Sequence, residues 1–129
     1  MAPLPRREDR GSAVVDFVLV MLVLTPLILG ILHLALVLHV RNTLTSAASE
    51  GARYAATLDR APADGVAKAR SEIGSALAGG FAREVTAVSV SVSGAPGVRV
   101  TVRAEVPPLG LWGPAMTVIA SGHAIEEDR

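Results

Sequence analysis

A carboxylate stands at the start of the longest apolar run in the chain. The residues before that run read Arg10-Gly11-Ser12-Ala13-Val14-Val15-Asp16-Phe17. A charged side chain at the centre of a bilayer costs on the order of 2.5–3.5 kcal/mol, so Asp16 needs a partner. If a peptidase cuts after Gly11, Ser12 gains an α-amino group one helical turn from Asp16. That amine can pair with the carboxylate within one chain, or between neighbouring chains, where it would set the axial register of packed helices.

The apolar run predicts a single membrane-spanning helix. No fixed charge occurs from Phe17 to Val40, a length of roughly 36 Å as a helix against an apolar layer of about 30 Å. Leu, Val and Ile occupy every face, so no polar stripe could face water. The run also exceeds the roughly 7–15 apolar residues of a cleaved secretory signal. Three arginines precede it (Arg6, Arg7 and Arg10) and two follow closely (Arg41 and Arg53), which mildly favours a cytoplasmic N-terminus.

A stripe of small residues follows the span. Leu44, Ala47, Ala48, Gly51, Ala55 and Leu58 recur at helical spacing, so the membrane helix is expected to continue outward with an amphipathic character. Small side chains let another helix or a sheet approach closely. Glu50 and Arg53 are three residues apart and are expected to pair on the exposed side.

Two motifs together resemble a known family. A basic leader (Met1–Gly11), four small or apolar residues, Asp16, Phe17 and the span resemble the processing site of type IV prepilin-like proteins. That family usually has glutamate where this chain has Asp16, which is one methylene shorter. Combined with Glu50-Gly51-Ala52-Arg53-Tyr54-Ala55-Ala56, the pattern resembles TadE-like proteins, minor pseudopilins of tight-adherence (Flp) pilus systems.

The resemblance covers roughly residues 9–58 and implies a function. It implies a non-enzymatic component of pilus assembly, cut after Gly11 by a membrane-bound prepilin peptidase and partnered by other pilins, pseudopilins and the assembly machinery. It also implies a single-pass protein of the cytoplasmic membrane, N-in and C-out, that could enter the pilus. The domains expected are a cytoplasmic leader (1–11), a transmembrane helix (12–40) and an extracytoplasmic head (41–129).

The rest of the head is predicted to be α+β, with about two helices and a three-stranded antiparallel sheet. A break from Asp59 to Asp64 precedes a short helix carrying Val66, Ala69, Ile73 and Leu77, which Gly79-Gly80 ends. Alternation then predicts half-buried strands over 88–93 and 98–106, joined by a turn at 94–97, and a third strand over 116–125. The helices are expected to cover one face of the sheet. Trp112 is expected to fold back on its own sheet, with a partner or the membrane interface as the alternative.

Composition and motifs exclude several classes of function. Twelve basic and twelve acidic residues, with 3% aromatics, give no footprint for nucleic acid. The chain has no cysteine, and His33 and His39 lie about 240° apart around a helix, so we expect no metal site there. We find no phosphate loop or nucleophile elbow, and therefore expect no enzyme and no cofactor.

Two other interpretations stay open at this point. The protein could be a permanently anchored, unprocessed envelope protein whose head binds a partner. It could also be a secreted head released by a cut near the small residues Ser46, Ala47 and Ala48.

Overall fold

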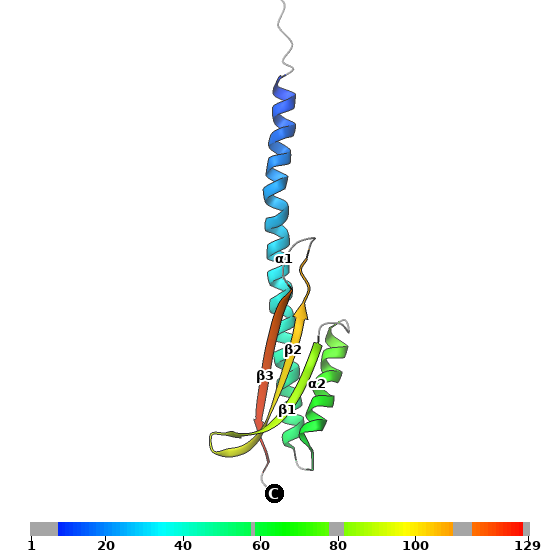
Figure 1. Cartoon of the computed structure of the whole chain (residues 1–129), viewed down its shortest axis with the longest axis vertical. Helices are drawn as coiled ribbons and strands as arrows, with labels where there is room; N and C mark the ends of the chain where they lie inside the picture. Colours follow the sequence, from blue (N-terminus) through cyan, green and yellow to red (C-terminus); the bar gives the residue numbers. More distant parts are fainter. Residues whose placement is uncertain (1–7, 58, 78–81, 110–114, 128–129) are drawn as a thin grey trace, which may run out of the picture.

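A long helix and a small α+β head make up the structure, a computed structural model (Figure 1). The structure describes residues 8–57, 59–77, 82–109 and 115–127. Its elements are α1 (Glu8–Ala56), α2 (Pro62–Ala76), β1 (Ala82–Val92), β2 (Ala95–Val106) and β3 (Met116–Ile125). The predicted architecture of one long apolar helix, a second helix and a three-stranded antiparallel sheet is confirmed. Met1–Arg7, Leu58, Gly79-Gly80 and Trp112 lie outside the described residues.

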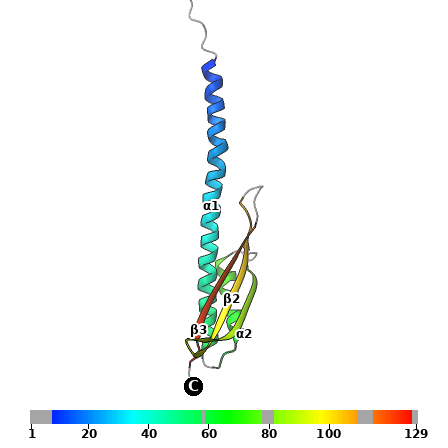
Figure 2. The same ribbon diagram turned by 60° about the vertical axis from the view of Figure 1, so that its left-hand side comes forward.

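Helix α1 is one continuous element of 49 residues with two different environments. Pro26 lies within it and does not end it, although the proline removes one helical hydrogen bond. From residue 11 to residue 32 every side chain is exposed, although nearly all are apolar. From Val37 to Ala56 one side of the same helix lies in the hydrophobic core. Figure 2 shows this second half lying along the sheet and beside α2.

The core of the head is built on that second half of α1. The predicted small-residue stripe is confirmed for its described members, all of which are buried: Leu44, Ala47, Ala48, Gly51 and Ala55. The core also takes in Val37 and Val40, the last turn of the predicted span. The head therefore begins to cover α1 before the apolar run ends.

Helix α2 begins at Pro62, within the segment expected to be a break. Proline is favoured in the first turn because it lacks only an N–H that would be unpaired there. The Asp64 carboxylate accepts a hydrogen bond from the Ala61 N–H at 2.8 Å and so caps the first turn. Gly65, Ala69 and Ile73 form the buried face of α2, and the helix runs back along α1.

The β1–β2 turn lies one position earlier than expected. It consists of Ser93 and Gly94, with φ of 52° and 87°, and Val92 pairs with Ala95 across it. A two-residue turn with positive φ at both positions matches the right-handed twist of a hairpin. Ala95, Pro96 and Gly97 therefore belong to β2, and β1 starts at Ala82 rather than at Val88. β2 is the central strand, in the order β1-β2-β3.

Val88 of β1 lies on the outer face of the sheet, so the expectation that it forms part of a half-buried face was wrong, whereas Val85 of the same strand is buried in the core. Val88 pairs with Arg99 and is 52% exposed, whereas Ser89 pairs with the buried Val98. A turn with an even number of residues pairs even positions of β1 with odd positions of β2. Val88, Val90 and Val92 of β1 therefore lie on the face opposite to that of the buried valines of β2. The β2 valines face the helices.

Glycines allow backbones to touch at two points of the head. A Cβ on Gly51 of α1 would lie 2.6 Å from the carbonyl oxygen of Gly65 in α2, and one on Gly65 would lie equally close to that of Gly51. On the sheet side, a Cβ on Gly122 of β3 would lie 2.4 Å from the Ser49 Cα of α1. Helix α1 thus lies between α2 and β3, and at these two crossings the backbones are in contact with no side chain between them.

Replacing Gly122 by alanine should destabilise the head. The new methyl group would meet backbone atoms of α1, and overpacking of this kind costs about 1–3 kcal/mol. Gly74→Ala is the matched control because nothing lies within 4 Å of that Cβ position. Because alanine has a higher helix propensity than glycine, Gly74→Ala should raise the free energy of unfolding of the head by up to about 1 kcal/mol. Urea unfolding of the full chain in detergent micelles, followed by circular dichroism, measures both. A Gly122→Ala midpoint at or above that of the wild type would contradict the close packing of β3 on α1.

Candidate site for processing and helix assembly

The Gly11–Ser12 peptide bond lies in the first turns of α1. The helix begins at Glu8, and the first four N–H groups of any helix lack intrahelical partners. Nothing lies within 4 Å of the position that a Gly11 Cβ would occupy. A glycine in a helix also weakens it by roughly 0.5–1 kcal/mol relative to alanine. The bond is therefore at an exposed helix end that can unwind locally at low cost, as a protease requires.

Asp16 and Phe17 lie one turn further along, on the exposed part of α1. Among the described residues, the Asp16 carboxylate forms no hydrogen bond and no ion pair. Phe17 is 62% exposed, so its ring is not used in packing the head. Within the monomer both side chains are available to another molecule.

Removal of residues 1–11 would change the electrostatics around Asp16. The new α-amino group on Ser12 would be largely protonated at neutral pH, and Asp16 would become the fifth residue of the shortened helix. The positive end of the helix dipole and the ammonium group would then both be near the carboxylate. The ammonium group at such a helix end can pair with the Asp16 carboxylate of its own chain or with that of a neighbouring chain.

The Glu50–Tyr54 motif has a packing role at its centre. Gly51 and Ala52 are buried, whereas Glu50 and Arg53 are exposed. The expected Glu50–Arg53 ion pair is not formed among the described residues. At the helix end, the Arg60 guanidinium stacks over the Tyr54 ring at 4.2 Å and donates a hydrogen bond to its hydroxyl. The motif thus fixes the crossing with α2 and the chain reversal that leads to it.

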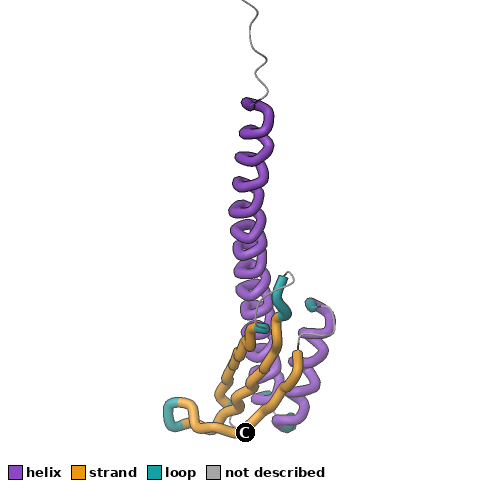
Figure 3. Tube along the Cα trace, turned by 45° about the horizontal axis from the view of Figure 1, so that its top comes forward, coloured by secondary structure: helices purple, strands orange, loops and turns teal. Residues whose placement is uncertain are grey.

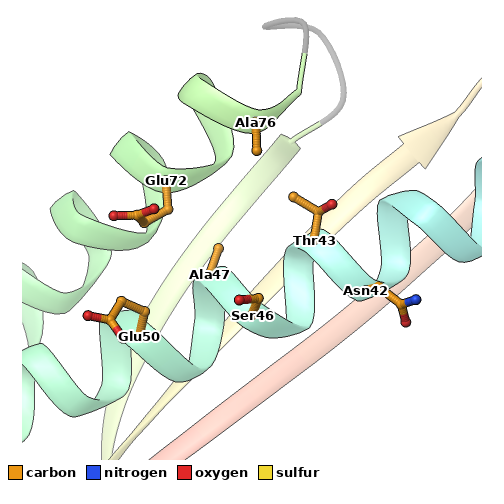
Figure 4. A pocket seen from close by; sticks show the side chains of 7 residues that line it. All are labelled: Asn42, Thr43, Ser46, Ala47, Glu50, Glu72 and Ala76. Atoms are coloured by element: carbon orange, nitrogen blue, oxygen red, sulfur yellow. The ribbon is translucent and has the colours of Figure 1, made fainter.

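Glu50 lines an open groove between α1 and α2. The groove has a volume of about 590 Å³, and Figure 4 shows Glu50 and Glu72 at the same end of it. Lys68 donates a hydrogen bond to Glu72 at 2.5 Å. That bond, and the charge of Glu72 and less strongly of Glu50, raise the pKa of the Lys68 ammonium. The other lining residues are Asn42, Thr43, Ser46, Ala47 and Ala76.

The described residues contain no cluster of three or more potential metal ligands. They do contain one helix that is long and apolar enough to cross a membrane, α1 itself. The groove lining offers hydroxyl, amide and carboxylate groups without a nucleophile–base pair.

Sequence reasoning did not identify Gly65 and Gly122 as important residues. Gly65 lies in α2 and Gly122 in β3, and neither belongs to a motif that the sequence pattern distinguishes. The small-residue stripe on α1 was the available signal, because two surfaces that approach a helix closely must themselves be small at the contact. The stripe does not indicate which residues of α2 and β3 contact it, because those contacts depend on the tertiary fold.

Residues 11–53, about a third of the chain, match the family model described as TadE-like protein. Neither a curated protein nor a solved structure matches the chain. The matched stretch begins at Gly11, includes Asp16 and the whole apolar run, and ends at Arg53 of the motif. The resemblance to TadE-like proteins seen in the sequence is therefore confirmed over these residues.

Proposed function

We propose that the protein is a TadE-like pseudopilin, a structural component of a Tad (Flp) pilus assembly system without catalytic activity of its own. In this proposal α1 crosses the cytoplasmic membrane with its N-terminus inside, and a prepilin peptidase removes residues 1–11. The observation that carries the proposal is the bare apolar half of α1, which bears at its N-terminal end a carboxylate without a partner among the described residues. The TadE-like match over the same residues supports it.

The exposed half of α1 fits a role in helix packing. Its apolar side chains are exposed all round the helix, so they can contact lipid first and other apolar helices later. Within a bundle of such helices, Asp16 would be costly unless a positive group lay beside it. Processing supplies such a positive group, the Ser12 ammonium of a neighbouring chain, close to the level of Asp16 along the helix axis.

The alternative of a secreted head is disfavoured by the packing of the core. A cut near Ala48 would remove Val37, Val40 and Leu44 from the head, and each is buried. Losing a buried side chain of this size costs about 2–5 kcal/mol, and three would exceed a small domain's usual stability. A permanently anchored protein that binds a partner keeps this core, and only processing and assembly distinguish it from the pseudopilin.

Co-expression with an active prepilin peptidase should give a mature chain that begins at Ser12. Intact-mass spectrometry of the purified protein measures this directly. Gly11→Val should leave the leader attached, since a branched side chain blocks close approach to the scissile backbone. Cells with an inactivated peptidase are the control, and there both proteins should retain Met1. A wild-type protein that keeps its leader beside an active peptidase would refute the processing step.

Asp16→Ala should impair assembly while leaving processing intact. Removing the carboxylate deprives the ammonium group of its partner, so we expect at least a tenfold loss of co-purification with other pilin subunits, a factor equal to about 1.4 kcal/mol. Asp16→Glu is the matched variant, because it keeps the charge, and it should retain association. Quantitative pull-down from detergent extracts, with equal amounts of mature protein, makes the comparison. Normal association of Asp16→Ala would instead favour the permanently anchored, unassembled protein.

A further inference from the structure

Exposed apolar side chains gather at the end of the head nearest the bare half of α1. Leu109, which follows β2, is 39% exposed, and Met116, the first residue of β3, is 46% exposed. We call these two residues the span-side tip. Figures 1 and 3 show the end of β2 and the start of β3 pointing along α1 toward its N-terminal half. Ile119, three residues further along β3, is 54% exposed.

The apolar run places the span-side tip close to the membrane surface. An apolar layer of about 30 Å needs roughly 20 helical residues, which extend from Phe17 to Leu36. Val37 is the next residue and is already only 9% exposed, because the head covers it. Arg41, the first charged residue after the run, is exposed and can place its guanidinium at headgroup level. The top of the head thus lies within about one helical turn of the apolar layer.

We propose that the span-side tip rests in the lipid headgroup region, with the Leu109 and Met116 side chains in contact with the acyl boundary. The occupant is the bilayer into which α1 is inserted, since the tip is the end of the head that points toward the bare apolar half of α1. The head is then held by two contacts, the helix and the tip, and does not turn freely about the helix axis. The inference rests on membrane insertion of α1 as proposed above, and not on processing or assembly.

The opposite end of the sheet provides a matched control. Val88 is as exposed as Met116, but it pairs with Arg99, seven residues along β2 from Val106, the partner of Met116. At about 3.4 Å per residue, Val88 lies roughly 24 Å from the tip along the strand. An apolar side chain at that distance should remain in water.

The chain contains no cysteine, so single cysteines can be introduced for labelling. Leu109→Cys, Met116→Cys, Val88→Cys and Leu29→Cys, each in the full chain, are labelled with an environment-sensitive fluorophore. The proteins are reconstituted in phosphatidylethanolamine–phosphatidylglycerol vesicles. Quenching is measured with lipids spin-labelled near the headgroup or deep in the acyl chain, and with aqueous iodide. Circular dichroism confirms that each labelled protein keeps its fold.

We expect headgroup-region quenching at positions 109 and 116 to be at least twice that at position 88, with the opposite order for iodide. Deep-label quenching at position 29 reports insertion of α1. If position 29 is quenched while the tip positions behave like position 88, the tip contact is wrong and membrane insertion stands. The same holds if the tip is shielded from both lipid and iodide. If position 29 is not quenched, both the inference and the proposed insertion fail.

Discussion

The fold depends on backbone contact between α1 and the two elements on either side of it. Gly51 meets Gly65 of α2, and Ser49 meets Gly122 of β3, at distances that leave no room for a Cβ. One helix can therefore be the central element of a very small head. Without these contacts, the sheet and α2 would have to bury their apolar faces on a wider helix with larger side chains.

The same contacts connect the membrane end of the protein to its head. No break in α1 separates Asp16 from Gly51, and 35 residues of helix correspond to roughly 52 Å. Under the proposed function, a register set by the carboxylate at one end would thus be transmitted to the position of the head at the other. The pairing of charged groups between neighbouring helices would fix the height of each head, which a flexible linker could not do.

The sequence predicted the elements better than their faces and partners. An uncharged run and a small-residue stripe are local signals, so the span, its outward extension and the three strands followed from periodicity. The outer position of Val88 did not, because the face of a strand depends on whether the hairpin turn has an even or odd number of residues. The Glu50–Arg53 pair also failed, since Glu50 faces the groove toward α2. Asp16 was singled out by its chemistry, and under the proposed function its partner is the Ser12 ammonium that processing would create, in the same chain or in a neighbouring one.

The head also restricts how neighbouring chains can approach α1. Beside the head, one side of the helix is buried from Val37 onward, and the opposite side, with Leu38, Arg41 and Thr45, is free. N-terminal to the head, the helix is bare all round. A neighbouring span at the same height must therefore pack on the free side, because the head-facing side would bring its own head into collision with the sheet. A neighbour on the head-facing side must be displaced along the axis. The geometry thus allows an unstaggered neighbour on the free side of α1 and only a staggered neighbour on the head-facing side.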